Sequence, residues 1–278
     1  MAWLQVSFFS TSLMRSVPLN ILIPADSMGP DGPQPKKPYK SLYLLHGYMG
    51  NCTDWILNTD ISGISQQLNL CVIMPSGENS FYVDHPSGMK YGEYVSRELV
   101  DFTRRLLPLS DKREDTIIAG LSMGGYGAIR NSLKYPDVFG YTIALSSALI
   151  LNAAISSTYE NNPMGINRGY YEAVFGDLDK LKGSDMDPER LAEKIIIENT
   201  TPTDLYIACG YNDALVFSNR ELHSYLDKIG YPHKYEEGPG THEWPFWKTY
   251  LRRGLGRIPG LDIAPEFVNP FWIDAESK

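Results

Sequence analysis

The stretch from Asp115 to Pro136, DTIIAGLSMGGYGAIRNSLKYP, constrains the fold of this chain more than any other. Its opening run, Thr116 to Ala119, is β-branched and apolar, which predicts a buried parallel strand. Residues from Tyr126 to Leu133 are typical of a helix. Between strand and helix, Gly120 to Gly124 fits the pattern G-x-S-x-G. The order of strand, sharp turn and helix predicts that the hydroxyl of Ser122 is exposed above the end of a sheet.

Small residues surround this serine, as a sharp turn between a strand and a helix requires. Gly120, Gly124, Gly125 and Gly127 supply that smallness. The alternative is a glycine-rich turn that holds an incidental serine, and the strand and helix on either side disfavour it.

The rest of the chain alternates between short apolar runs and helical patterns. Two β-rich runs near the start, at 4–8 and 17–23, predict an antiparallel hairpin, and the alternation after them predicts a mainly parallel sheet with helices on both faces. The predicted strands after the hairpin are 41–45, 70–74, 116–119, 141–145, 205–209 and 233–237. The predicted helices are 60–68, 91–106, 126–133, 188–197, 218–229 and 243–255.

The chain of 278 residues is expected to form one α/β domain that spans residues 1–278. The alternation stops between residues 146 and 201, where clusters of Gly, Asn and Asp occur among aromatic residues. A segment of this length after a sheet strand predicts a partly helical cap or lid within the domain. The proline- and glycine-rich stretch 24–38 is interpreted as a surface connection.

The net charge and composition limit the classes of binding partner that are expected. The net charge of −8 disfavours nucleic acid and anionic membranes, so a small substrate that is not strongly anionic is expected. Neither a signal peptide nor a membrane span is expected at the N-terminus. The three scattered cysteines (Cys52, Cys71 and Cys209) show no disulfide framework, and Cys71 and Cys209, within apolar runs, are predicted to be buried thiols. A reducing, cytoplasmic location is the default expectation. The tail after Gly256, rich in proline and aromatics, is a candidate contact for a homo-oligomer.

Histidine is the residue that would activate Ser122, because a serine hydroxyl is a weak nucleophile near neutral pH. Three histidines follow the serine. His223 falls within a helical pattern and His233 starts a strand, whereas His242 lies in a glycine-rich loop after the last predicted strand. A side chain on that loop can reach back over the sheet edge, so His242 is predicted as the base and a surface histidine is the alternative.

A carboxylate must orient the histidine, and in this class of fold it lies between the serine and the histidine in sequence. Asp213 follows directly on the carboxyl end of a predicted strand, where open α/β sheets place functional groups. Asp204 begins the same strand and Asp227 lies within a helix, so both are disfavoured. Asp213 is therefore the predicted acid, with a turn or helix-capping aspartate as the alternative.

Acyl transfer also needs two donors for the developing oxyanion. The backbone N–H of Met123, the residue after the serine, is one candidate. The other is the N–H of Tyr48, in the loop His46-Gly47-Tyr48 that follows a buried strand, although a shift by one residue would select Gly47 or Met49 instead. His46 precedes the serine and is interpreted as a residue that braces this loop.

Aromatic residues near the predicted site could form a pocket for a short acyl chain or a phenolic ring. The candidates for substrate binding are Trp55, Phe81, Tyr82 and Trp244, and Phe246 and Trp247 lie close by in sequence. Asp84 and His85 could bind a polar alcohol portion. The alternative for each of them is ordinary packing or a solvated loop.

Six sequence blocks also resemble the esterase D family of α/β-hydrolases, which includes tributyrin esterases, feruloyl (cinnamoyl) esterases and S-formylglutathione hydrolases. In order, they read LLHGYMGN, YGEYVSRELV, GLSMGGYGA, KYPDVFG, CGYNDAL and GTHEWPFW. The resemblance implies an α/β-hydrolase fold, the triad Ser122, Asp213 and His242, and oxyanion donors at Tyr48 and Met123. At the oxyanion loop, Gly47 to Gly50 departs from the Gly-Leu-Thr-Cys stretch of S-formylglutathione hydrolases, which argues against that substrate.

These observations predict a serine carboxylic ester hydrolase that needs no cofactor or metal and acts on short-chain acyl or hydroxycinnamoyl esters. Three alternatives remain, and the first is hydrolysis of S-formylglutathione by the same triad. An acyltransferase would use the same residues with an acceptor other than water, and a non-catalytic binding protein would keep the scaffold without the chemistry.

Overall fold

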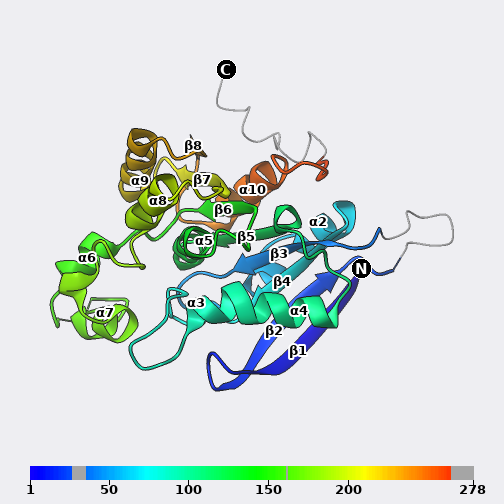
Figure 1. The fold of residues 1–278 in the computed structure, drawn as a ribbon, viewed down its shortest axis with the longest axis horizontal. Coiled ribbons are helices and arrows are strands. Elements are labelled where there is room, and N and C mark those ends of the chain that lie inside the picture. Colours follow the sequence, from blue (N-terminus) through cyan, green and yellow to red (C-terminus); the bar gives the residue numbers. More distant parts are fainter. Residues whose placement is uncertain (27–35, 161, 264–278) are drawn as a thin grey trace.

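A computed structural model describes residues 1–26, 36–160 and 162–263 (Figure 1). Most of the predicted surface connection and the end of the predicted tail lie outside these residues. An eight-stranded sheet forms the centre, in the spatial order β1-β2-β4-β3-β5-β6-β7-β8. The strands are β1 (Ala2–Ser10), β2 (Arg15–Ile23), β3 (Lys40–Leu45), β4 (Leu70–Pro75), β5 (Thr116–Leu121), β6 (Tyr141–Leu145), β7 (Asp204–Gly210) and β8 (His233–Gly238).

The sheet is mixed, as predicted. Strands β1 and β2 form an antiparallel hairpin, and β2 also runs antiparallel to β4, whereas every pair from β4 to β8 is parallel. The central parallel strands β4 and β5 are fully buried because helices cover both faces, whereas the edge strand β8 is only partly buried. This arrangement is the α/β-hydrolase fold, with β8 at one edge and β1 at the other.

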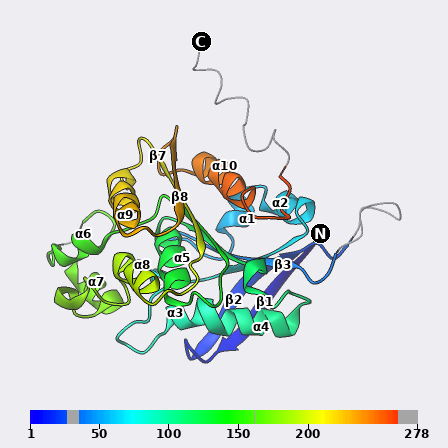
Figure 2. The same cartoon turned by 45° about the horizontal axis from the view of Figure 1, so that its top comes forward.

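Side chains that alternate along the strands build a core on each face of the sheet. Tyr43 and Ile118 belong to a core that includes residues of α4 and α5, whereas Leu42 and Ile117 belong to one that includes residues of α2 and α10. Figure 2 shows these helices on either side of the sheet. The helices of the sheet-covering layers are α1 (Asp54–Asn58), α2 (Ile61–Gln67), α3 (Tyr91–Glu93), α4 (Leu99–Leu106), α5 (Met123–Lys134), α8 (Pro188–Ile197), α9 (Val216–Ile229) and α10 (Trp244–Leu255).

The predicted helix at 91–106 contains a wide turn. Residues Tyr94–Glu98 form a π-helical segment between α3 and α4. A π turn inserts one residue into the helical repeat, so the side chains beyond it change phase. Beyond this turn Leu99 and Val100 are buried, while Leu106 at the end of α4 is 48% exposed.

The segment predicted as a cap forms several helices between β6 and β7. In order they are α6 (Leu151–Ile155), α7 (Arg168–Phe175), the 3-10 turn Leu178–Lys180 and α8. Helix α8 packs against α5 and α9 and so belongs to the layer on the sheet, whereas α6 and α7 lie at the periphery (Figure 1). The description of 146–201 as a lid stays a prediction.

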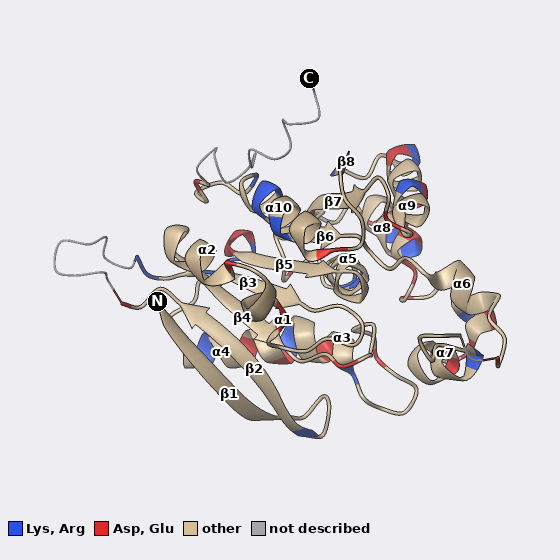
Figure 3. Ribbon diagram, turned by 180° about the vertical axis from the view of Figure 1, so that it is seen from behind, with Lys and Arg blue, Asp and Glu red and all other residues tan. Residues whose placement is uncertain are grey.

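Charged residues help to fix α10 against the rest of the fold. Basic residues gather on this helix (Figure 3), where Arg252 and Lys248 pair with Asp60 at the start of α2. Within the described residues, no helix has the length and apolar character needed to cross a membrane.

Candidate active site

Ser122 occupies a strained turn between β5 and α5. Its backbone lies at φ 54° and ψ −118°, a conformation that costs energy in any residue with a side chain. Glycines permit the close approach of strand and helix: a Cβ atom at Gly120 would collide with the carbonyl of Gly124, and one at Gly124 would lie 2.6 Å from the carbonyl oxygen of His46. The geometry is that of a nucleophile elbow.

Backbone hydrogen bonds fix this turn and leave its hydroxyl unengaged. The N–H of Ser122 donates to the carbonyl of Leu145 at 2.8 Å, and the N–H of Ala148 donates to the carbonyl of Ser122 at 2.9 Å. The side chain is half-buried, and its Oγ has no hydrogen-bond partner among the residues that the structure describes. The hydroxyl is therefore free to meet a ligand.

His242 and Asp213 form a hydrogen-bonded pair. Nδ1 of His242 lies 2.9 Å from Oδ2 of Asp213, while the backbone N–H of Leu215 donates to the other carboxylate oxygen at 2.9 Å. Asp213 is buried, and the His242 side chain is 37% exposed. With Nδ1–H directed to the carboxylate, Nε2 of His242 is the atom that can accept a proton.

The carboxylate of Asp213 is held in its charged form. Burial raises the pKa of Asp213, but hydrogen bonds from His242, from the N–H of Leu215 and from Ser146 outweigh burial, so the pKa lies below its ordinary value. The paired carboxylate thus stays negative at neutral pH and can stabilise a positive imidazolium.

Sheet register brings Ser122, Asp213 and His242 to the side of the sheet where the parallel strands have their carboxyl ends. Strands β5, β6, β7 and β8 are neighbours and parallel, and their residues Leu121, Leu145 and Ala208 lie side by side. The loop after β8 folds back over β7, because the N–H of Asn212 donates to the carbonyl of Gly240 at 3.2 Å. The carboxyl ends of parallel strands meet at this edge, where such sheets carry their sites.

Two backbone donors lie beside the elbow. A Cβ atom at Gly47 would stand 3.4 Å from the Cβ of Ser122, so the loop after β3 lies directly against the serine. The N–H of Met123 begins α5 and that of Tyr48 belongs to this loop, and neither has an acceptor within the described part of the chain. Free N–H groups at a helix N-terminus and in an adjoining loop suit a developing negative charge.

His46 braces the loop after β3, in line with the sequence interpretation. Its Nδ1 lies 2.7 Å from the carbonyl of Gly47, and its Nε2 accepts a hydrogen bond from the N–H of Gly77 at 2.9 Å. The side chain is 1% exposed, and burial lowers the pKa of His46. A neutral ring with both nitrogens engaged is a structural residue rather than a base.

The structure buries three of the four aromatic residues proposed for substrate binding. Trp55, Phe81 and Tyr82 are each 3% exposed or less, and the polar groups of Trp55 and Tyr82 bond to backbone carbonyls at the end of β3 and at His46. These buried side chains pack inside the protein and support the loops around the site. Trp244 is half-buried and meets Trp55 edge to face at 5.3 Å.

Asp84 and His85 also serve the local framework. The carboxylate of Asp84 accepts a hydrogen bond from the N–H of Glu93 and pairs with Lys134, and Nε2 of His85 lies 3.0 Å from the carbonyl of Ser80.

The cysteines Cys71 and Cys209 take no part in the chemistry proposed for the site. Burial raises the pKa of their thiols to about 12, which keeps both protonated and unreactive.

Two contacts near the site had no distinctive sequence signal. Nε1 of Trp247 donates to Oγ of Ser146 at 3.0 Å, and the Trp247 ring meets the His242 ring edge to face at 4.9 Å. From α7, Tyr170 meets the Tyr48 ring edge to face at 5.7 Å and donates its hydroxyl to the carbonyl of Asn79. Both depend on segments that are far apart in sequence.

Comparisons with known proteins identify similar chains. A family model described as "Putative esterase" matches residues 10–258. An acetyl esterase of Caldicellulosiruptor saccharolyticus is 44% identical over 258 residues, which cover 90% of this chain and 96% of that protein. Two solved structures from Staphylococcus aureus each cover 91% of this chain and 96% of their own: fluorophosphonate-binding serine hydrolase F with bound substrate (TM-score 0.80, 32% identity) and the S-formylglutathione hydrolase FrmB (TM-score 0.77, 31% identity).

Proposed function

This chain belongs to the esterase family of α/β-hydrolases and is a carboxylic ester hydrolase of the serine type, and on that premise we propose that Ser122, His242 and Asp213 are its catalytic triad acting on short-chain acyl esters. The observation that carries the assignment is the hydrogen bond between His242 and a buried, charged Asp213, at the sheet edge where the elbow presents Ser122. The substrate is a small ester.

In the first half of the reaction, Oγ of Ser122 attacks the carbonyl carbon of the ester while Nε2 of His242 takes the hydroxyl proton. The bond to the alcohol then breaks, and His242 returns the proton to the leaving oxygen. Asp213 holds the ring through Nδ1 and stabilises its positive charge. The products of this half are the free alcohol and an acyl group on Ser122.

In the second half, water replaces the alcohol. His242 accepts a proton from water, the hydroxide attacks the acyl carbon, and Ser122 leaves with that proton to restore the starting state. In both halves the carbonyl oxygen becomes negative, and the N–H groups of Met123 and Tyr48 are placed to receive it. The loss of one such donor typically costs about 3 to 4 kcal/mol of transition-state stabilisation.

The preference for a short acyl group rests on two supports. A relative with 44% identity over almost its whole length is an acetyl esterase. The rings of Tyr48 and Tyr170 pack together beside the candidate oxyanion donor, and the hydroxyl of Tyr170 donates to the carbonyl of Asn79, so two bulky side chains are held next to that donor. A hydroxycinnamoyl group is larger and is the less favoured substrate.

A second candidate is the hydrolysis of S-formylglutathione. The S-formylglutathione hydrolase FrmB is 31% identical to this chain, and the match covers 91% of this chain and 96% of FrmB. The formyl group is smaller than acetyl and would meet the same triad. The loop Gly47 to Gly50 reads GYMG, which departs from the pattern of that branch. An ester of a neutral alcohol therefore remains the favoured substrate.

The test is a rate panel with p-nitrophenyl acetate, butyrate, octanoate, methyl ferulate and S-formylglutathione. We expect the highest kcat/KM with acetate and a steep fall with longer chains. A fluorophosphonate probe should label wild type and Ser156→Ala, a variant at an exposed serine, but not Ser122→Ala. Labelling of Ser122→Ala would contradict the nucleophile, and a maximum with methyl ferulate or S-formylglutathione would contradict the acyl preference while leaving the triad intact.

An added alcohol distinguishes a hydrolase from an acyltransferase. With acetate ester and increasing glycerol or methanol, a hydrolase releases mainly free acetate at each concentration. If the acetyl group passed predominantly to the alcohol at low concentration, the enzyme would be an acyltransferase on the same residues.

A further inference from the structure

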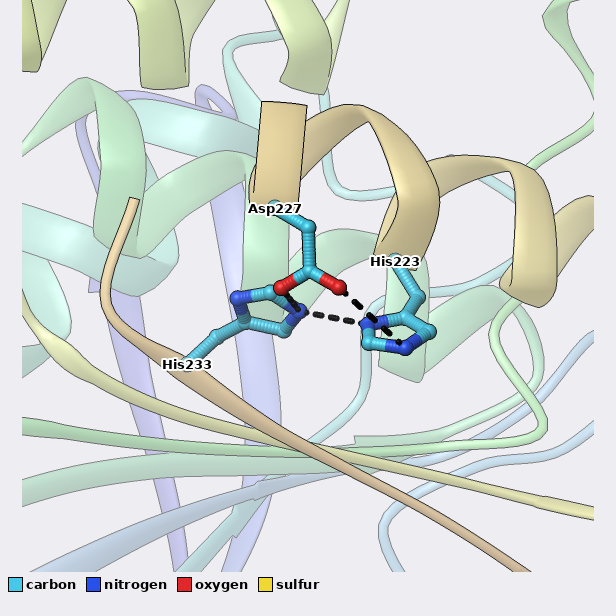
Figure 4. Close-up of side chains that lie close together, drawn as sticks. All are labelled: His223, Asp227 and His233. Carbon is cyan, nitrogen blue, oxygen red and sulfur yellow. Dashed lines mark hydrogen bonds and ion pairs between the residues drawn. The ribbon is translucent and has the colours of Figure 1, made fainter. Parts of the chain in front are cut away.

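A second group of chemically active side chains lies away from the candidate active site. His223 and Asp227 on α9 and His233 at the start of β8 point toward one another (Figure 4). One ligand atom from each lies within 4.8 Å of the others. We propose that these three residues bind a divalent transition-metal ion, with Zn²⁺ as the preferred metal.

The local fold explains how the three residues meet. His223 and Asp227 are four residues apart on a helix and so share one face. Helix α9 ends at Ile229, and Gly230, at φ 70°, allows the chain to reverse. After this turn His233 opens β8, so its side chain returns beside the last turns of α9.

His233 is held with one nitrogen available. Its side chain is 2% exposed, and its Nδ1 lies 2.9 Å from the carbonyl of Tyr231. A carbonyl only accepts, so Nδ1 carries the proton and Nε2 carries a lone pair. A histidine whose other N–H donates to a backbone carbonyl is the usual form of a metal ligand.

The contacts inside the cluster leave acceptor atoms facing each other. Nε2 of His233 lies 2.8 Å from Nδ1 of His223. Because Nε2 of His233 carries a lone pair, Nδ1 of His223 must be the donor in this hydrogen bond. The remaining nitrogen of His223 faces a carboxylate oxygen of Asp227 at 3.6 Å, so in the neutral ring two acceptors oppose each other. Within the described residues Asp227 pairs with no lysine or arginine. A cation bound among the three side chains would satisfy all of them.

The geometry is close to that of a metal site. Two nitrogens bound to tetrahedral Zn²⁺ at about 2.0 to 2.1 Å stand roughly 3.3 Å apart, so a small rotation of His223 would be enough. His223 is one-third exposed and stacks on Tyr235 at 4.5 Å, and Asp227 is 64% exposed. The exposed carboxylate leaves a route for the ion and room for water as a fourth ligand.

The donor set selects the metal. Imidazole nitrogens with one carboxylate suit Zn²⁺ and its neighbours among the transition metals. Magnesium and calcium prefer sets made of oxygen, so they should bind weakly here.

The position of the cluster indicates a structural rather than a catalytic role. His233 lies at the amino end of β8, whereas His242 follows the carboxyl end of the same strand. A bound ion would link α9 to this edge strand, because two ligands come from the helix and one from the strand. The expected effect is greater stability of that edge.

The experiment uses the full chain without a histidine tag, stripped with a chelator and titrated with Zn²⁺ by calorimetry and with Co²⁺ by visible absorption. We expect one ion per chain, a tetrahedral Co²⁺ spectrum and a higher Tm with Zn²⁺. Asp227→Ala and His223→Gln should weaken Zn²⁺ binding by roughly 100-fold or more and abolish the rise in Tm. Circular dichroism without metal checks that both variants fold.

Two control variants separate this site from other zinc binding. Asp101→Ala removes an exposed aspartate on α4 and should bind Zn²⁺ as wild type does. His242→Gln removes the histidine of the candidate active site and should also keep the affinity. The proposal is overturned if wild type binds no Zn²⁺ at micromolar concentrations, if Asp227→Ala binds as tightly as wild type, or if only His242→Gln loses the ion.

Discussion

The indole N–H of Trp247 donates a hydrogen bond to Oγ of Ser146, which connects α10 to the residue that follows β6. Ser146 is fully buried and has a φ of 46°. It lies next to Asp213 and contributes to the low pKa of that carboxyl, while the Trp247 ring stands edge-on to His242. One tryptophan thus contacts the histidine directly and the aspartate through a serine.

Trp247→Phe keeps an aromatic ring beside His242 but removes the donor to Ser146. We expect kcat to fall roughly 3- to 30-fold with little change in KM, because the His242–Asp213 pair loses its fixed position and substrate contacts remain. The free energy of unfolding should fall by about 1 kcal/mol. Steady-state kinetics and urea unfolding measure the two effects.

Trp3→Phe is the matched control, since Nε1 of Trp3 also donates a hydrogen bond, to Asn20 in the hairpin far from the site. It should leave kcat within twofold of wild type. Equal losses of kcat in both variants would show that Trp247 acts only through general stability.

Asp213→Asn tests the acid of the proposed triad. The amide keeps the shape but cannot stabilise the imidazolium, so kcat should fall by about 10⁴-fold. Asp204→Asn alters an exposed aspartate at the opposite end of β7 and should stay within twofold. The initial rates with p-nitrophenyl acetate distinguish them, and a loss below tenfold for Asp213→Asn would remove that residue from the triad.

Gly124→Ala tests the close packing beneath the elbow. The new methyl group would stand 2.6 Å from the carbonyl of His46 and 2.7 Å from that of Leu45, and backbone cannot move aside cheaply. We expect the free energy of unfolding to drop by about 1 to 3 kcal/mol, together with activity. Gly63→Ala, on an exposed face of α2 with nothing within 4 Å, should instead gain roughly 0.4 to 1 kcal/mol. Denaturant unfolding measures both free energies. A Gly124→Ala variant that is as stable as wild type, or a Gly63→Ala variant that is less stable, would contradict the prediction.

Glu98 provides a pH-dependent tie between the hairpin and the π-helical segment. Its carboxylate accepts hydrogen bonds from Ser10, Thr11 and Ser12 at 2.6 to 3.2 Å. Burial raises the pKa of Glu98, but these bonds outweigh it, so the folded pKa lies below the ordinary 4.5. The stabilisation is therefore complete above about pH 4.5 and disappears as the pH falls through the folded pKa.

Glu98→Gln should reduce the free energy of unfolding by about 1 to 3 kcal/mol at pH 7. The difference from wild type should shrink at pH 3, which lies below the ordinary pKa of 4.5, because protons then bind the unfolded carboxyl more readily than the folded one. Glu114→Gln, at an exposed position, should stay within about 0.5 kcal/mol at both pH values. A difference for Glu98→Gln that is the same at pH 7 and pH 3 would contradict the role of its charge.

Much of the fold was predictable because it follows from local periodicity. Buried parallel strands are short apolar runs, and each predicted strand of the sheet forms within a few residues of its expected bounds. The triad candidates could be selected because an α/β sheet places its functional groups after strand ends, which excluded Asp204 and His233 by position alone. Their catalytic roles stay predictions until the variants are measured.

Other features depend on contacts that no local pattern records. Trp55, Phe81 and Tyr82 lie in short helices or loops, where an aromatic residue can face water or fold beneath the surface. Helices α6 and α7 are short and interrupted, so they lack a repeat long enough to detect. The meeting of His223 with His233 needs the reversal at Gly230, although the four-residue spacing of His223 and Asp227 was a visible hint.

The groups proposed for catalysis come from the ends of several adjacent strands, and β8, which precedes His242, is the outermost of them. A sheet that lacks β8 therefore cannot assemble Ser122, Asp213 and His242 together. During refolding, esterase activity should return only when β8 has docked on β7, after much of the helical signal has recovered. The enzyme's own turnover would then act as a reporter for the completion of its sheet.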